Sequence, residues 1–166
     1  MSLDAPFRIE RLADHDRRDF DSGSAPLDQY LRTQVGQDIR RRVTSCFVAV
    51  GRDGVVAGFY TLAPTGIAYA DLPETVTRRL PRYALIPAYR LGRLAVDRRA
   101  QGLKLGAALL ADTLLRALRA EATGYALVVD AKDEAAAFYR RQGFLEFSGL
   151  PLSLFIPLAT GGKAAG

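Results

Sequence analysis

The chain has few residues of the kinds that bind metals, form disulfides or cross membranes. It has one cysteine, Cys46, and one histidine, His15, which excludes an internal disulfide and gives no His/Cys cluster for a metal ion. Tryptophan is absent, and apolar runs such as residues 107–111 fall far short of the roughly 18 residues that a membrane helix needs. No basic and then apolar leader opens the sequence. We therefore expect a cytoplasmic protein without metal, membrane segment or secretory signal.

Length and composition are typical of one globular domain. The 166 residues are 49% hydrophobic and 25% charged, which predicts one core and argues against a disordered or disulfide-stapled chain. The basic residues are unusual, because 20 of the 23 are arginine, and the net charge is +5. Arginine suits phosphate groups through bidentate hydrogen bonds. A coding bias that uses arginine for any solvated cation explains the same count, so composition alone leaves both explanations open.

The hydrophobic pattern predicts strands that alternate with helices. Candidate strands lie at residues 7–10, 44–50, 55–62, 84–96, 125–129, 144–147 and 152–156. One helix begins after Ser24 and continues or restarts through residues 37–42, and others span residues 72–80, 105–122 and 133–141. This order predicts an α/β domain with a mixed sheet over residues 1–158, followed by a flexible tail at residues 159–166.

The most informative segment joins the strand that ends at Val96 to the helix that begins at Leu105. Its turn is basic and contains glycine, and the free backbone N–H groups at a helix start can bind a phosphate or pyrophosphate. The patterns Gly-x-x-x-x-Gly-Lys-Ser/Thr and Gly-x-Gly-x-x-Gly are both absent. The segment therefore indicates an anion site of another kind, with an ordinary strand-to-helix turn as the alternative.

Two segments resemble signatures of the GNAT family, the Gcn5-related N-acetyltransferases. Residues 101–106, Gln-Gly-Leu-Lys-Leu-Gly, resemble the family's pyrophosphate loop Gln/Arg-x-x-Gly-x-Gly/Ala, and Lys104 replaces its middle glycine. Residues 135–144 resemble the second signature, Ala-x-x-Phe/Leu-Tyr-x-x-x-Gly-Phe, and Lys132 stands where many members have an asparagine. The resemblance implies a single-domain GNAT fold: a mixed central sheet with helices on both faces and a splayed parallel strand pair that holds acetyl-CoA.

The resemblance also implies roles for individual residues. Tyr139 would be the catalytic acid that protonates the departing thiolate, while a core aromatic is the alternative. A backbone N–H near Ala95 or Val96 would polarise the thioester carbonyl. No side chain stands out as a general base, and His15 is interpreted as a surface residue. The residues expected to bind acetyl-CoA are Leu94, Ala95, Val96, Arg98, Arg99, Gln101, Gly102, Leu103, Lys104, Leu105, Gly106, Ala107 and Phe138.

Residues 20–31 resemble the opening of GNAT toxins from bacterial toxin–antitoxin pairs. Their pattern is Phe-x-Cys-Gly-x-x-x-Leu-Asp-x-Tyr/Trp-Leu, and Ser22 stands at the cysteine position. This resemblance implies an enzyme that acetylates the α-amine of aminoacyl-tRNA and blocks translation, a ribbon-helix-helix antitoxin as partner, and a possible homodimer. Two alternatives stay open: a GNAT enzyme for a small amine or a protein N-terminus, and a non-catalytic GNAT binding module.

An RNA acceptor gives the arginines a candidate role. Eight of them precede or flank the predicted cofactor strand and could contact phosphates, and their alternative is a set of solvated surface cations. The candidates for nucleic-acid binding are Arg40, Arg41, Arg42, Arg78, Arg79, Arg82, Arg90 and Arg93. The sequence does not fix which aminoacyl-tRNA would be chosen.

Overall fold

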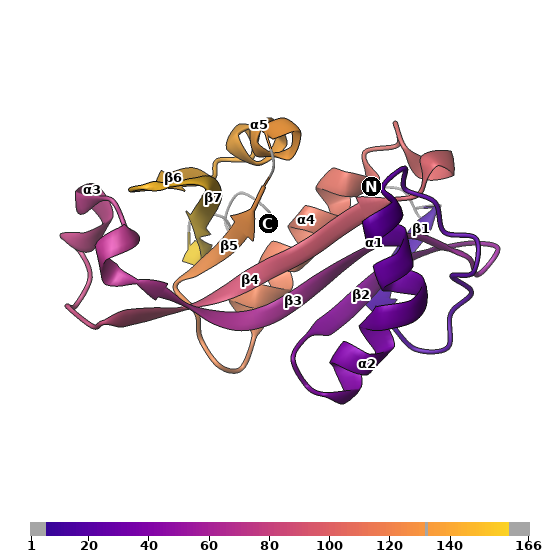
Figure 1. Ribbon diagram of the computed structural model, residues 1–166, viewed down its shortest axis with the longest axis horizontal. Helices are drawn as coiled ribbons and strands as arrows, with labels where there is room; N and C mark the ends of the chain where they lie inside the picture. The colour runs from indigo at the N-terminus through magenta and orange to yellow at the C-terminus, as the bar shows by residue number, and fades with distance from the viewer. Residues whose placement is uncertain (1–5, 132, 160–166) are drawn as a thin grey trace. The chain divides into compact units, whose positions relative to one another are not determined.

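A computed structural model describes residues 6–131 and 133–159 (Figure 1). Its seven strands pair in the order β1-β2-β3-β4-β5-β7-β6. The pairs β1–β2, β2–β3, β5–β7 and β6–β7 are antiparallel, whereas β4 and β5 are parallel, so the predicted mixed sheet is confirmed. The strands are β1 (Phe7–Arg11), β2 (Ser45–Gly51), β3 (Val56–Ala68), β4 (Leu85–Val96), β5 (Ala126–Asp130), β6 (Leu145–Phe147) and β7 (Leu150–Pro157).

Helical segments connect the strands. The α-helices are α1 (Ala25–Gln29), α2 (Val35–Arg40), α3 (Glu74–Thr77), α4 (Leu105–Arg119) and α5 (Asp133–Arg141). A π-helical turn, η1 (Tyr30–Gln34), joins α1 to α2, and two 3₁₀ turns are η2 (Tyr69–Asp71) and η3 (Arg98–Ala100). The chain forms two compact units. Unit 1 contains residues 1–63 and 92–113, and unit 2 contains residues 64–91 and 114–166.

In unit 1, helices cover both faces of the sheet. Val48 of β2 and its cross-strand partner Phe59 of β3 belong to one buried cluster with Leu31 of η1. On the opposite face Phe47 stacks on Tyr60, with ring centroids 5.2 Å apart, and the Tyr60 hydroxyl donates to Asp112 of α4 at 2.6 Å. Because residues alternate between the two faces of a strand, β2 is buried on both sides and reads as a continuous apolar run.

In unit 2, the parallel pairing of β4 with β5 is short. Its register runs from Ala88 opposite Ala126 to Leu91 opposite Val129, whereas β4 continues to Val96. Ala126 of β5 belongs to a buried cluster that also contains Leu72, the residue between η2 and Pro73 at the start of α3. The pairing therefore ends well before β4 does, as expected for a splayed strand pair.

The largest differences from the predicted element boundaries concern β3, α3 and α4. Strand β3 does not end at residue 62 but passes through Pro64, because Ile67 returns to the buried face and is 4% exposed. The helix predicted for residues 72–80 is only α3, because Leu72 is in the core and Pro73, the extended N-cap residue, separates it from the helix. Helix α4 ends at Arg119 rather than at residue 122. The domain boundary at residue 158 remains a prediction, and of the predicted tail only Ala159 is among the described residues.

Candidate active site

The turn after β4 is built around a buried carboxylate. Asp97 is 2% exposed, and its Oδ1 accepts from the backbone N and the Nε of Arg99 at 2.9 and 3.0 Å. Its Oδ2 accepts from the backbone N of Asp21 at 3.1 Å. Burial raises the pKa of this carboxyl, but the hydrogen bonds from Arg99 and Asp21 outweigh burial and hold the pKa below its usual value. Asp97 therefore fixes η3 against the N-terminal segment.

The predicted cofactor residue Gln101 holds the same turn. Its side-chain amide donates to the carbonyl oxygens of Ser22 and Val96 at 3.2 and 3.1 Å. The backbone N of Arg98 donates to the Asp21 carbonyl oxygen at 2.8 Å, and its guanidinium lies 3.4 Å from the Asp21 carboxylate. The loop that resembles the GNAT family and the segment that resembles its toxins are thus joined directly. Contacts of Gln101 and Arg98 with a cofactor remain predictions.

The start of α4 fits an anionic ligand. Gly102 and Lys104 have φ of +85° and +60°, and Lys104 accepts the hydrogen bond from the backbone N of Ala108 at 3.2 Å. The first turn of α4 contains no acidic residue, so nothing on it opposes a phosphate at the N–H groups of residues 105–107. A Cβ on Gly106 would meet only Val96, at 4.0 Å. The residues present therefore fit a pyrophosphate, and the positive φ of Lys104 explains why the family has glycine there.

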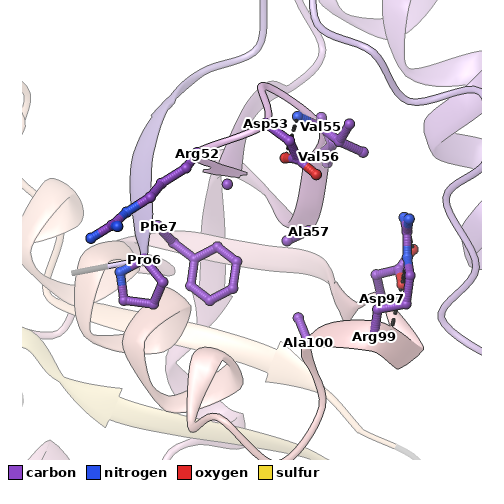
Figure 2. Close-up of a pocket in the computed structure, with 11 residues that line it drawn as sticks. Pro6, Phe7, Arg52, Asp53, Val55, Val56, Ala57, Asp97, Arg99 and Ala100 are labelled. Atoms are coloured by element: carbon purple, nitrogen blue, oxygen red, sulfur yellow. Dashed lines mark hydrogen bonds and ion pairs between the residues drawn. The ribbon is translucent and has the colours of Figure 1, made fainter. Parts of the chain in front are cut away.

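Arg99 occupies the edge of a cavity on unit 1. The cavity has a volume of about 410 Å³, and Figure 2 shows Arg99 and Asp97 at one side of it and Phe7 at another. Most of its walls are apolar, and its lining residues are Pro6, Phe7, Gly51, Arg52, Asp53, Val55, Val56, Ala57, Asp97, Arg99 and Ala100. Arg99 is therefore a partner of Asp97 in this structure, and its phosphate contact remains a prediction.

The last residues of β4 distinguish the two candidate N–H groups. The backbone N of Asp97 donates to the Ala57 carbonyl oxygen of β3 at 2.8 Å. N–H groups alternate between the two edges of a strand, so the N–H of Ala95 also points toward β3 and that of Val96 points away from it. Of the two groups predicted to polarise the thioester, only Val96 thus offers its N–H at the edge away from β3.

Tyr139 lies on α5 in unit 2, and its side chain is 8% exposed. Its ring meets Phe138 and Phe144 edge-on, with centroids 5.1 and 5.3 Å away. Burial raises the pKa of the Tyr139 phenol to about 12, so the hydroxyl keeps its proton at neutral pH. Among the described residues this hydroxyl has no hydrogen-bond partner. Lys132, which stands where many family members have an asparagine, lies outside the described residues.

The candidate RNA-binding arginines are divided between the two units. In unit 1, the Arg93 guanidinium lies 3.6 Å from the centroid of the Tyr30 ring, and residues 40–42 are exposed at the end of α2. In unit 2, Arg78, Arg79 and Arg82 are exposed at and after α3. Arg90 is half-buried and forms an ion pair with Asp130. Seven of the eight arginines are thus exposed to solvent. Arg90 instead pairs with Asp130, a residue that the sequence pattern did not single out.

The interpretation of His15 as a surface residue is wrong. Its side chain is 10% exposed. Its Nδ1 accepts from the backbone N of Ala13 at 3.0 Å, which leaves the proton on Nε2 to donate to Glu10 at 2.6 Å. Both ring nitrogens are engaged, so His15 supports the N-terminal loop.

Two kinds of feature were not found among the described residues. Within residues 6–131 and 133–159, no group of three His, Cys, Asp or Glu side chains is placed to hold a metal ion. In the same part of the chain, no helix combines the length and the apolar character needed to cross a membrane.

Comparison with known proteins identifies the family. Residues 42–146 match the model of the acetyltransferase (GNAT) domain. A Mycobacterium tuberculosis protein named tRNA-acetylating toxin is 43% identical over 138 residues, which are 81% of this chain and 80% of the relative. The structure of AtaT complexed with acetyl-methionyl-tRNAfMet has a TM-score of 0.83 and 30% identity, and covers 93% of this chain and 96% of that chain. A Tyr-to-Phe mutant of AtaT bound to the C-terminus of the antitoxin AtaR and acetyl-CoA has a TM-score of 0.78 and 27% identity, and covers 95% of this chain and 97% of that chain. The chain therefore belongs to the GNAT acetyltransferase family.

Proposed function

We propose that this protein is an acetyl-CoA-dependent N-acetyltransferase that modifies the α-amine of aminoacyl-tRNA and thereby stops translation. The observation that carries the proposal is the 43% identity, over 81% of the chain, to a tRNA-acetylating toxin. The AtaT complex with acetyl-methionyl-tRNA supports the same acceptor. Membership of the GNAT family supports acetyl-CoA as the donor.

The residues have separate roles in this reaction. Bound acetyl-CoA supplies the acetyl thioester. The N–H groups at the start of α4 bind the pyrophosphate, since the turn leaves them free and no acidic side chain opposes an anion. The N–H of Val96 donates to the thioester oxygen as negative charge develops there. Tyr139 holds the proton that the departing sulfur takes.

The raised pKa of Tyr139 suits that proton transfer. A thiol in the same apolar surroundings also has a raised pKa, because burial disfavours every negative charge. The protein itself contains an example, since burial raises the pKa of the Cys46 thiol to about 12, as burial does for Tyr139. Burial therefore raises the pKa of the proton donor and that of a sulfur acceptor in the same direction. The acceptor needs no strong base, because an α-amine with a pKa of about 8 is partly neutral at pH 7.

An RNA acceptor accounts for the exposed arginines. Residues 40–42 in unit 1 and Arg78, Arg79 and Arg82 in unit 2 are exposed, so their charges are available to phosphates. Each phosphate contact releases counterions from the RNA, so the affinity that it contributes falls as the salt concentration rises. We expect the affinity for charged tRNA to fall steeply between 50 and 200 mM salt, by about 10³-fold or more if six phosphates are contacted.

The proposed function also implies a partner and a compartment. AtaT has been solved with the C-terminus of the antitoxin AtaR, which supports an antitoxin as partner, and we infer that the partner of this protein is a ribbon-helix-helix antitoxin. We place the protein in the cytoplasm, because its proposed acceptor is used there in translation. Formation of a homodimer remains a prediction.

Transfer of labelled acetyl groups tests the proposal. The purified protein is incubated with labelled acetyl-CoA and a complete pool of charged tRNA, and in parallel with polyamines and with peptides that have a free N-terminus. We expect label on charged tRNA, released by mild base as N-acetyl amino acid. Label only on the other amines would contradict the acceptor, and no label on any amine despite acetyl-CoA binding would indicate a binding module.

Variants of two tyrosines test the role of the catalytic acid. Tyr139→Phe removes the hydroxyl and should lower turnover by about 10²- to 10⁴-fold. Tyr125→Phe is the matched control, because Tyr125 is also a partly buried tyrosine of unit 2 with a raised pKa. Equal turnover of Tyr139→Phe and the unchanged protein would remove Tyr139 from the mechanism.

A further inference from the structure

The carboxylate of Asp130 is held in a fixed orientation at the end of β5. Arg90 of β4 donates to its Oδ2, and the hydroxyl of Ser153 on β7 donates to its Oδ1 at 2.7 Å. The Asp130 side chain is nevertheless 62% exposed. A carboxylate has about four acceptor positions, so this one is supported from both neighbouring strands and still open to a further donor.

The position of Asp130 in the strand register places it at the reaction centre of the proposed function. Val129, the residue before it, is the last residue of β5 in register with β4, where it lies opposite Leu91. In the proposed function, the acetyl thioester lies where this pairing ends. The inference rests on the proposed function for the place of the thioester and for the identity of the acceptor.

Asp130 and Tyr139 belong to opposite faces of the sheet in unit 2. Side chains alternate along β5, so Asp130 shares its face with Val128 of the buried cluster under α3. The other face carries Ile156, whose side chain is 3.6 Å from the Cβ position of Gly143, just after α5. An acceptor that approaches from the Asp130 face therefore meets the thioester opposite the helix that carries the proton for the sulfur.

The charges on the Asp130 face suit an amine attached to RNA. Arg78 is the C-cap residue of α3 and Arg79 follows it. The charge of Arg79 opposes the rise that burial causes in the pKa of Tyr125, the residue directly before β5. Asp130 lies five residues further, about 17 Å along the strand. One face of unit 2 thus offers cations for a polyanion at one end and an accessible carboxylate for a cation at the other.

We propose that Asp130 binds the α-amine of the acceptor, and that Arg90 and Ser153 are positioning residues for its carboxylate. Asp130 attracts the ammonium form and accepts hydrogen bonds from it, and one proton leaves to solvent before attack. The C–N bond then forms and the C–S bond breaks. The extra proton on the new amide nitrogen passes to Asp130, and the Tyr139 proton passes to sulfur. Both residues recover their starting states by exchange with water.

Binding of two matched RNA ligands tests the proposal without turnover. Both are minihelices with a stable 3′-amide link; one carries an α-amino acyl group and the other its α-hydroxy analogue. We expect the unchanged protein to prefer the amine by about tenfold or more, as for a hydrogen bond to a charged group. In Asp130→Asn the preference should fall to about one, while affinity for the hydroxy ligand is unchanged.

Control variants separate recognition from general damage. Glu146→Gln, at another exposed carboxylate of unit 2 that pairs with Arg140, should keep the full preference. Ser153→Ala should reduce the preference partly and raise the KM for charged tRNA more than it changes kcat. Asp130→Asn that keeps the amine preference, or weakens both ligands equally, would overturn the proposal. If the unchanged protein binds neither RNA ligand but acetylates another amine, the proposed acceptor is wrong, and that amine and its hydroxy analogue decide the role of Asp130.

Discussion

Replacing Lys104 provides a direct test of the pyrophosphate loop. Lys104 has φ of +60°, and this left-handed conformation costs an L-residue about 1–2 kcal/mol, whereas glycine adopts it freely. Glycine also increases the conformational entropy of the unfolded chain, which lowers the free energy of unfolding by about 0.4–1 kcal/mol. Lys104→Ala is the matched variant, because it removes the ammonium and keeps the strain. We expect Lys104→Gly to be more stable than Lys104→Ala by roughly 0.5–1 kcal/mol.

Calorimetry measures this difference. In a protein of 166 residues, 1 kcal/mol shifts the melting temperature by about 2–4 °C. Lys104→Gly should therefore melt about 1–4 °C above Lys104→Ala. Equal melting temperatures, or a lower one for the glycine variant, would refute the argument that this position requires glycine for its backbone conformation.

The same two variants measure the charge of Lys104. An ammonium 4 Å from a phosphate contributes about 1 kcal/mol in water, which corresponds to roughly fivefold in Kd. We expect both variants to bind acetyl-CoA about fivefold more weakly at low salt, and the difference to shrink at high salt. Unchanged affinity of Lys104→Ala at low salt would show that the ammonium makes no phosphate contact.

Three further variants test the supporting structure. Asp97→Asn should cost about 1.5–3 kcal/mol at pH 7; since the pKa of Asp97 is lowered in the folded protein, this stabilisation is present above the unfolded pKa and is lost as pH falls through the folded one. Urea midpoints of the two proteins should thus converge as the pH falls below the usual carboxyl range, and a constant gap would contradict the argument. Gly124→Ala would place a Cβ 2.8 Å from the Tyr89 ring and should lower stability by about 1–3 kcal/mol in the same assay, whereas an unchanged midpoint would show that the ring moves freely. Arg93→Gln removes the cation over the Tyr30 ring and should cost about 0.5–1 kcal/mol, and an unchanged midpoint would show that the contact contributes nothing.

The parts of the fold that depend on local pattern were predictable from the sequence. The apolar run of β2 and the β-hairpin to β3 follow from residue type and spacing, and the loop before α4 follows from a basic, glycine-containing turn between a strand and a helix. The π-helical turn at Tyr30–Gln34 was not predictable. Tyr30 and Leu31 of this turn belong to a buried cluster, and such a tertiary contact is not encoded in helical periodicity, which alone predicts a regular α-helix.

The supports of the site depend on contacts between distant residues. Asp97 meets Asp21, 76 residues earlier, and Gln101 meets Ser22, 79 residues earlier. Neither contact leaves a periodic signal. A local signal existed for Asp97 alone, because an aspartate directly before a helical turn often accepts from the backbone two residues on. Asp130 had no such signal, since its partners lie on two other strands.

The contacts of Ser22 show why the toxin-like segment and the pyrophosphate loop belong together. Its carbonyl oxygen accepts from Gln101, a role that any residue at this position can fill. Its hydroxyl donates to the buried Asp28 at 2.6 Å, and its backbone N donates to the same carboxylate oxygen at 2.9 Å. A thiol is a weaker donor than a hydroxyl, so serine in place of the toxins' usual cysteine strengthens this turn. Ser22, although it departs from the toxin pattern, therefore keeps the turn geometry that supports Gln101 of the pyrophosphate loop.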